Sequence, residues 1–336
     1  MNKKILDCTL RDGGHVNNAD FGKEKIKGII HGLVDAKIDY VELGFLRNGN
    51  FTEHQALYND VKEIIPYLPE EQQNTKFTVM IRPDWYDITQ LSESNSKIET
   101  IRFAFYYKDI KLLKEQCKVA KAKGYHNICN PVNIMGYTDE YLKKLIEQVN
   151  EIHPEQLTLV DTYGSMRIPN LQHIYEIIEK YLEKDIRVGL HLHENQSLAF
   201  GLAQKFLDLK KADRSIVIDG SLFGMGRVPG NLCIEVIAEY MNSIYKTCYD
   251  VDKLYFLIGK YIESIKQVIP WGYSPAYFIT ACLNMHRSYA EFLLKRKNLS
   301  LSDINEILKT IEPDMRSEFH GDYLEKKYQE YLSKIM

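Results

Sequence analysis

Ile5-Leu6-Asp7-Cys8-Thr9-Leu10-Arg11-Asp12-Gly13-Gly14-His15 is the stretch of the sequence that decides the fold. Its apolar first half is typical of a buried strand, and its two glycines allow the backbone to turn sharply. We therefore expect Arg11, Asp12 and His15 at the carboxyl end of a strand. In an α/β barrel the chemistry takes place at that end of the strands. A surface ion pair followed by a turn would explain this stretch alone equally well.

Strand-like and helix-like segments alternate after this opening stretch. Short apolar runs predict strands at 40–45, 76–81, 100–105, 126–134, 156–161, 186–193 and 216–222. Amphipathic segments predict helices at 23–36, 53–65, 84–91, 110–123, 138–152, 170–182, 196–209 and 231–245. This alternation predicts an α/β protein in which residues 1–245 form a closed (β/α)₈ TIM barrel. An open doubly wound sheet is the alternative, but no Gly-rich dinucleotide loop follows the first strand.

Residues 246–336 contain no alternating strands and predict a helical C-terminal domain. Helices are expected at 251–269, 276–297 and 301–311 and from Tyr323 onward, with a break at 270–275. We expect this domain to dock on the barrel, complete the site and offer an interface.

The composition excludes several classes of protein. A net charge of −3 predicts no strong attraction to nucleic acid or to an anionic membrane. No apolar run approaches the length of a membrane span, and the first residues lack the apolar region of a secretory signal. Six scattered cysteines favour reduced thiols over a disulfide framework. These features predict a cytoplasmic protein.

His191 and His193 lie near the end of the seventh predicted strand. Side chains two positions apart on a strand point in the same direction, so both imidazoles can bind one ion. With Asp12 they form a two-nitrogen, one-carboxylate set that leaves open positions and suits Mn²⁺, Mg²⁺ or Fe²⁺. Zinc is less favoured without thiolates. Two histidines packed in the mouth of the barrel are the alternative.

A glycine-rich loop follows the eighth predicted strand. Residues 224–231 read Gly-Met-Gly-Arg-Val-Pro-Gly-Asn before the last helix of the barrel. Such a loop can bind an anion at this place in a barrel, although it often only caps a helix.

Five motifs in this order resemble those of the metallolyase barrels. They are Thr9-Leu10-Arg11-Asp12-Gly13, Val41-Glu42-Leu43-Gly44-Phe45, Asp161-Thr162-Tyr163-Gly164, His191-Leu192-His193-Glu194-Asn195 and residues 224–231. That superfamily contains hydroxymethylglutaryl-CoA (HMG-CoA) lyase, isopropylmalate and homocitrate synthases, and 4-hydroxy-2-oxovalerate aldolase. The resemblance implies a TIM barrel with a metal at Asp12, His191 and His193, most readily Mn²⁺ or Mg²⁺.

Two features resemble the aldolase branch of the superfamily. His15 stands where those aldolases carry their catalytic histidine, and residues 272–277 resemble a segment that supplies a tyrosine, here Tyr277. Gly14, Glu194 and residues 227–229 depart from the family pattern and leave the substrate open.

The resemblance implies a divalent-metal-dependent (class II) aldolase or lyase. It would make or break a C–C bond of a 4-hydroxy-2-oxo acid through a pyruvate-type enolate. Arg11 is then an electrostatic clamp on the enolate, and His15 a base that takes the 4-hydroxyl proton near neutral pH. Tyr277 either delivers a proton to the enolate carbon or only packs on the barrel.

The remaining residues of the motifs have more open roles. Asn231 is expected as a further metal ligand or as a neighbour of the ligands. Glu42 is expected to orient Arg11 or a ligand histidine, or simply to form a buried pair with Arg11. The residues expected to bind the substrate carboxylate are Thr162, Gly224, Gly226 and Gly230.

Two alternative functions and several partners follow from the same resemblance. A Claisen-type synthase that uses acyl-CoA shares the metal motifs, and a non-catalytic barrel subunit would need none of them. The expected partners are a 2-oxo acid, an aldehyde, a second copy of the chain in a homo-oligomer and an acylating aldehyde dehydrogenase.

Overall fold

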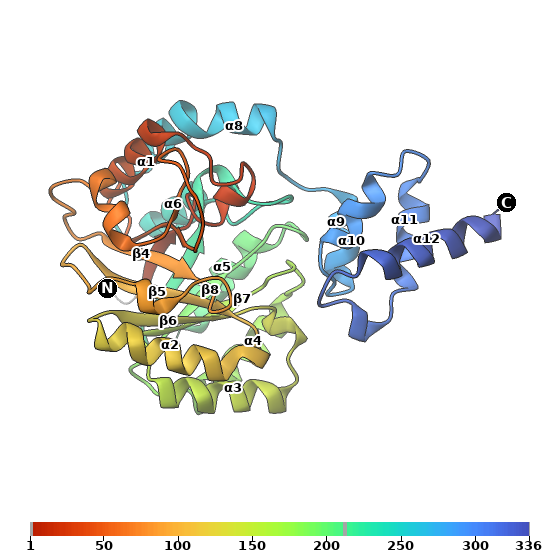
Figure 1. Cartoon of the computed structure of the whole chain (residues 1–336), viewed down its shortest axis with the longest axis horizontal. Coiled ribbons are helices and arrows are strands. Elements are labelled where there is room, and N and C mark those ends of the chain that lie inside the picture. The colour runs from red at the N-terminus through yellow and green to blue at the C-terminus, as the bar shows by residue number, and fades with distance from the viewer. Residues whose placement is uncertain (1–2, 211–213, 336) are drawn as a thin grey trace.

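The computed structural model describes residues 3–210 and 214–335, and parallel strands form a closed barrel at its centre (Figure 1). β1 pairs with β9 on one side and with β2 on the other, and this second pairing closes the ring. The barrel strands are β1 (Lys3–Asp7), β2 (Tyr40–Leu46), β4 (Lys76–Ile81), β5 (Ile98–Phe105), β6 (His126–Pro131), β7 (Gln156–Val160), β8 (Arg187–His191) and β9 (Ile216–Gly220). The predicted TIM barrel is confirmed.

Helices cover the outside of the barrel. They are α1 (Lys23–Asp35), α2 (Ile110–Ala122), α3 (Asp139–Ile152), α4 (Ile168–Tyr181), α5 (Ala199–Leu209) and α6 (Ile234–Tyr245). Each buries an apolar stripe, as the 3.6-residue periodicity predicts. Thr138 caps α3 by accepting a hydrogen bond from the Tyr141 amide at 3.3 Å.

Two predicted helices of the barrel are wrong. Residues 53–65 instead form β3 (Leu57–Tyr58) and 3₁₀ turns, because this segment pairs with the end of β2. The approach is close enough that a Cβ atom on Gly44 would lie 2.2 Å from the Ala56 carbonyl oxygen. Residues 84–91 keep only a short 3₁₀ helix, whose first turn is capped by the Asp87 carboxylate.

The next two helices pack on the barrel. α7 (Val251–Leu257) packs beside α1 and α6, and a π-helical turn joins it to α8 (Glu263–Val268). Small residues on α1 permit this contact, since a Cβ atom on Gly32 would lie 2.3 Å from the Leu257 side chain. The hydrophobic core of the barrel therefore extends to Trp271. The division of the chain at residue 245 stays a prediction.

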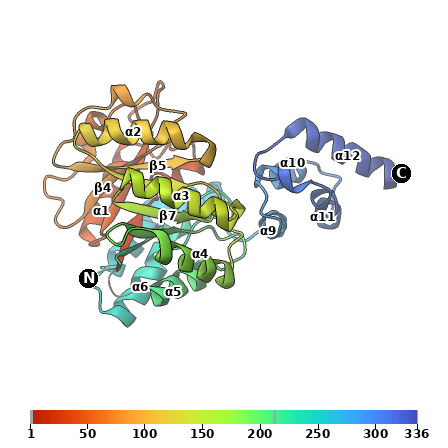
Figure 2. The ribbon, with the colours of Figure 1, turned by 90° about the horizontal axis from the view of Figure 1, so that it is seen from below.

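Residues after Trp271 form a helical module with its own small core (Figure 2). Its helices are α9 (Pro275–Cys282), α10 (Ser288–Leu294), α11 (Leu301–Lys309) and α12 (Gly321–Ile335). One continuous helix over 276–297 was expected and is wrong. Asn284 has a left-handed φ of 47°, and the His286 amide donates to the Arg316 carbonyl instead of continuing a helix. The described helices include none that is long and apolar enough to cross a membrane.

Candidate active site

A cavity of about 750 Å³ opens at the carboxyl ends of the barrel strands. Residues that follow β1, β2, β7, β8 and β9 line it, together with His286 and Arg287 from the C-terminal module. The module reaches the barrel through the loops after β7 and β9, where Arg287 Nη1 donates to the Val228 carbonyl at 3.2 Å. The site therefore lies between the barrel and the module.

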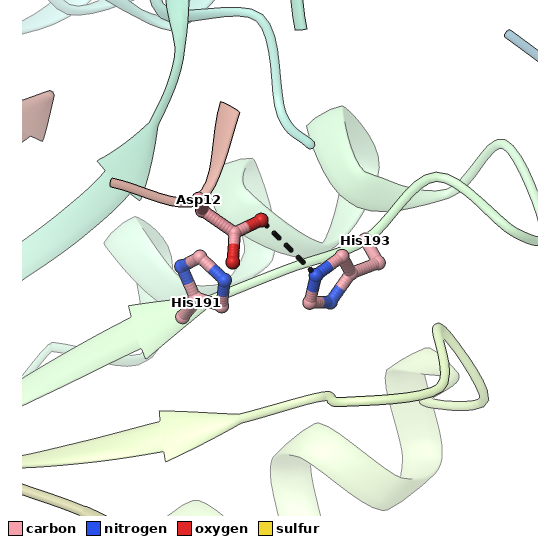
Figure 3. A group of neighbouring side chains, drawn as sticks. All are labelled: Asp12, His191 and His193. Atoms are coloured by element: carbon pink, nitrogen blue, oxygen red, sulfur yellow. Dashed lines mark ion pairs between the residues drawn. The ribbon is translucent and has the colours of Figure 1, made fainter. Parts of the chain in front are cut away.

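Asp12, His191 and His193 converge in this cavity (Figure 3). Asp12 follows β1, His191 is the last residue of β8, and His193 lies just beyond it. One ligand atom from each lies within 4.8 Å of the others, and His193 Nε2 is 3.6 Å from Asp12 Oδ2. The structure thus brings together the three residues that the sequence predicted as metal ligands.

Each histidine has one ring nitrogen directed away from Asp12. His191 Nδ1 lies 3.3 Å from Asp219 Oδ2, and His193 Nδ1 lies 2.9 Å from the Asp161 carbonyl oxygen. The Asp161 carbonyl can accept from His193 Nδ1–H, and the Asp219 carboxylate faces His191 Nδ1, so each Nε2 lies on the side of Asp12. Burial lowers the pKa of His191, so its neutral form is favoured.

A buried ion-pair network surrounds Asp12. Arg11 donates to Asp12 Oδ1 at 2.5 Å and to Glu42 Oε2 at 2.6 Å. Arg102 bridges Glu42 and Asp219 from the opposite side. Burial opposes ionisation of Asp12, but Arg11 and then His193 outweigh burial and hold its pKa well below the usual range. Glu42 therefore contacts Arg11 and not a ligand histidine, while Asp219 is the carboxylate that faces His191.

Two observations indicate that a divalent cation fits here. The three buried carboxylates, Asp12, Glu42 and Asp219, exceed the two buried guanidiniums, Arg11 and Arg102, by one negative charge. Two imidazole nitrogens with one carboxylate form a facial donor set with open positions.

Asn231 extends the donor set. Its Nδ2 donates to Asp12 Oδ2 at 2.8 Å, while its Oδ1 is buried without a hydrogen-bond partner among the described residues. A buried amide oxygen without a partner costs free energy unless a cation or a water satisfies it. Position 226 must be glycine for Asn231 to take this place, because a Cβ atom on Gly226 would lie only 2.6 Å from Asn231 Nδ2.

The glycine loop contacts the cavity differently from the expectation. The amides of Gly224 and Gly230 donate to the Ser221 and Arg227 carbonyls, so neither is free to bind a carboxylate in this conformation. The loop instead lines the cavity with Arg227 and Val228. Thr162 does line the cavity, and its Oγ1 accepts from the Asn133 amide at 2.7 Å, which leaves the hydroxyl proton available for a ligand.

His15 lines the same cavity beside Phe45, with 5.5 Å between the ring centroids. It was expected to titrate near neutral pH. Burial, and then the positive charge of Arg227, lower the pKa of His15 to about 3. The imidazole is therefore neutral at ordinary pH, with one unprotonated ring nitrogen, and it is a weaker base than a free imidazole.

Tyr277 is the expected site residue that the structure places least favourably. It packs in a small apolar cluster with Ala276, Ala290 and Val228, and it does not line the described cavity. The Arg287 guanidinium, which does line the cavity, lies 5.9 Å from the centroid of the Tyr277 ring. A proton-transfer role for Tyr277 stays a prediction.

Four charged residues of the site were missed from the sequence. Arg102 and Asp219 are charged residues inside otherwise apolar strands, and that pattern is a usable signal. Arg227 and Arg287 carry no such signal, because only the folding of the loop and the module brings them to the cavity.

Comparisons with known proteins agree with this geometry. A 4-hydroxy-2-oxovalerate aldolase of Thermomicrobium roseum is 22% identical over 244 residues, covering 72% of this chain and 67% of the relative. An oxaloacetate decarboxylase of Mycobacterium tuberculosis is 22% identical over 254 residues, covering 75% of this chain and 74% of the relative. An HMG-CoA lyase structure from Brucella melitensis superposes with a TM-score of 0.65 at 16% identity, covering 79% of this chain and 98% of the other.

The fold and these relatives place the chain in the metallolyase superfamily of TIM barrels, and they support a lyase role at the level of the family. Within that superfamily it belongs to the HMGL-like family, whose sequence model matches residues 2–256.

Proposed function

We propose that this protein is a divalent-metal-dependent aldolase that makes or breaks a C–C bond of a 4-hydroxy-2-oxo acid. One observation carries the proposal: the Asp12, His191 and His193 donor set shares a cavity with Arg11 and a neutral His15. Relatives named 4-hydroxy-2-oxovalerate aldolase support the same reaction type. The metal would be held by Asp12, His191 and His193, with Asn231 Oδ1 as a further ligand. Mn²⁺ and Mg²⁺ are our first choices.

The chain's own groups can carry the proton and charge changes of cleavage. His15 takes the 4-hydroxyl proton, the bond between C3 and C4 breaks, and its electron pair forms the enolate while the aldehyde leaves. Arg11 is fixed by Glu42 and Asp12, so its remaining N–H groups can donate to the enolate oxygen. The Thr162 hydroxyl can donate to the substrate carboxylate. When bound, the cation supplies Lewis acidity toward the oxygens of the 2-oxo acid.

A direct test offers pyruvate with a panel of aldehydes and Mn²⁺ or Mg²⁺, without CoA, and reads the products by mass. An adduct of pyruvate and an aldehyde supports the proposal. A product that forms only with acyl-CoA would favour the Claisen-type synthase. An acylating dehydrogenase partner, a homo-oligomer and a cytoplasmic location remain predictions.

Loss of the carboxylate behind His191 is expected to weaken metal binding. Asp219→Asn removes the negative charge that faces His191 Nδ1 at 3.3 Å, and loss of such a group behind a ligand typically costs about 10- to 100-fold in metal affinity. Titration with Mn²⁺ measures the change, and Asp252→Asn at an exposed position is the matched control. Unchanged affinity in a folded Asp219→Asn protein would show that Asp219 serves only Arg102.

Replacement of Arg11 by lysine is expected to slow turnover strongly. Lysine keeps the charge but cannot contact Glu42, Asp12 and the substrate with one planar group. Loss of an oxyanion-type donor costs about 10² to 10³ in rate. Turnover is compared with Arg82→Lys, whose guanidinium pairs with Asp84 at the cavity. A nearly wild-type rate in Arg11→Lys would reduce Arg11 to a structural ion pair.

A further inference from the structure

The cavity carries more positive charge than the proposed reaction centre requires. Arg11 and Arg102 are neutralised within the buried network around Asp12. Four further arginines line the same cavity, and they are Arg47, Arg82, Arg227 and Arg287. Asp12 is the only carboxylate among the described lining residues. The cavity outside the reaction centre is therefore suited to an anion.

Arg227 is an unpaired member of this set. It lies in the loop after β9, and its guanidinium forms no ion pair or side-chain hydrogen bond with any described residue. Its positive charge nevertheless lowers the pKa values of neighbouring groups. Burial, and then Arg227, lower the pKa of His286 to about 4 and that of Arg287 to about 10. Two positive charges therefore lie together at this part of the cavity wall, and among the described residues only that of Arg287 is paired, with Glu291.

Arg287 lies beside Arg227, and one N–H group of its guanidinium has no acceptor in the described part of the chain. Its Nη1 donates to the carbonyl of Val228, the residue after Arg227, and its Nη2 pairs with Glu291. Its Nε is buried and has no hydrogen-bond partner among the described residues. A buried guanidinium nitrogen without an acceptor is costly, and a ligand oxygen would satisfy it.

The two arginines line the same cavity as His15, and their charges act on its imidazole. Arg227 exerts the largest charge effect on the His15 imidazole, and Arg287 contributes in the same direction. In the proposed reaction, His15 faces the 4-hydroxyl group, which belongs to the aldehyde half of the substrate. An anion held by Arg227 and Arg287 would therefore belong to that half, and not to the 2-oxo acid.

We propose that Arg227 and Arg287 bind a carboxylate or phosphate group carried by the aldehyde half of the substrate. This inference rests on the proposed aldolase function and adds to it the class of the second substrate. Because Arg287 comes from the C-terminal module and Arg227 from the barrel, the anion would contact both bodies at once. The C-terminal module would then contribute to the specificity for the aldehyde.

A second pair of arginines in the cavity is less suited to this task. Arg82 is held by a two-point ion pair with Asp84, and its guanidinium lies over the Trp85 ring at 4.0 Å. Arg47 lies over the same tryptophan ring at 5.0 Å, and like Arg227 it is exposed and forms no ion pair in the described part of the chain. Arg47 is consequently the matched control for Arg227.

The experiment compares charged and uncharged aldehydes of similar size in the presence of pyruvate and Mn²⁺. The pairs are 4-oxobutanoate with butanal, and glyceraldehyde 3-phosphate with glyceraldehyde. The readout is the ratio of kcat/KM for the charged aldehyde to that for its uncharged partner. In the wild-type protein at least one ratio is expected to exceed about tenfold, and which pair gives it separates a carboxylate from a phosphate.

The variants locate the anion. Arg227→Gln should lower the ratio by about tenfold, Arg227→Lys should retain most of it, and Arg47→Gln should leave it in place. A wild-type ratio near one for both pairs overturns the inference. So does an Arg227→Gln protein that keeps the ratio, or an Arg47→Gln protein that alone loses it.

A binding measurement separates the inference from the proposed function. Calorimetric titration with 4-oxobutanoate and with glyceraldehyde 3-phosphate needs no turnover. Tight binding that Arg227→Gln weakens about tenfold supports the anion site even if no aldol product forms, and in that case only the aldolase proposal fails. Aldol products from butanal or glyceraldehyde, with no binding of either anion, leave the aldolase proposal standing and overturn the anion site.

Discussion

Removal of divalent metal by a chelator is expected to abolish aldol cleavage and addition. Lewis acidity toward the 2-oxo acid contributes several kcal/mol to transition-state stabilisation, so its loss corresponds to at least about a hundredfold in rate. Mn²⁺ or Mg²⁺ should restore the activity. Rates are measured before chelation, after it and after each metal is added back.

Substitutions of the proposed metal ligands test whether the metal acts at this site. His191→Ala and His193→Ala should each weaken metal binding by about tenfold or more, because even loss of a group behind a ligand costs that much. A second group of possible ligands, His153, Glu183 and Asp185, lies exposed away from the cavity. His153→Ala is therefore the control and should change neither metal affinity nor rate. Full activity in chelator, with a borohydride-reducible imine on a lysine, would instead identify a Schiff-base aldolase.

Replacement of His15 by alanine is expected to lower aldol cleavage by about 10² to 10⁴, the usual effect of losing a general base. Decarboxylation of oxaloacetate makes the same enolate without a hydroxyl proton to remove, and a relative bears the name of that activity. Decarboxylation should consequently fall much less than aldol cleavage in His15→Ala. Both rates are measured on one protein preparation, with His54→Ala at an exposed position as the control.

The pH dependence provides a second readout of His15. A base with a pKa of about 3 is unprotonated at every pH above that value, so its activity is lost only as the pH falls toward 3. The wild-type profile of kcat/KM should therefore show no acid limb from His15 between pH 5 and 8. A limb in that range that disappears in His15→Ala would contradict the burial of this imidazole. Equal loss of both reactions would show that His15 only supports the metal site.

The sequence predicted the barrel and brought together most of the residues of the candidate site. Apolar runs alternating with amphipathic segments locate the strands because burial depends directly on side-chain chemistry. The carboxyl ends of parallel strands meet at one edge, which explains why Asp12 and His191, 179 residues apart, could be placed together. The spacing of His191 and His193 then predicted that both imidazoles face one ion.

Prediction of secondary structure from local sequence patterns was wrong where a segment distant in the sequence changed the local conformation. Residues 53–65 have apolar residues that suit a helix, yet pairing with β2 drew Leu57 and Tyr58 into a strand. The expected helix over 276–297 breaks because Arg316 accepts the His286 amide. In both cases a long-range hydrogen bond outweighed helix propensity, which amounts to only a few tenths of a kcal/mol per residue.

Tertiary structure alone determines which charged side chains surround the candidate metal ligands. It also determines which residues of the C-terminal module line the cavity. Asp219 reaches His191 because β9 lies beside β8 in the closed ring, and Arg102 reaches Asp219 across the interior of the barrel. The low pKa of His15 depends on burial and on the charges of Arg227 and Arg287, whose positions no local pattern encodes. Arg227 and Arg287 are 60 residues apart and meet only when the module docks on the barrel. Electrostatic energies depend on distance and burial, and both quantities exist only after the chain has folded.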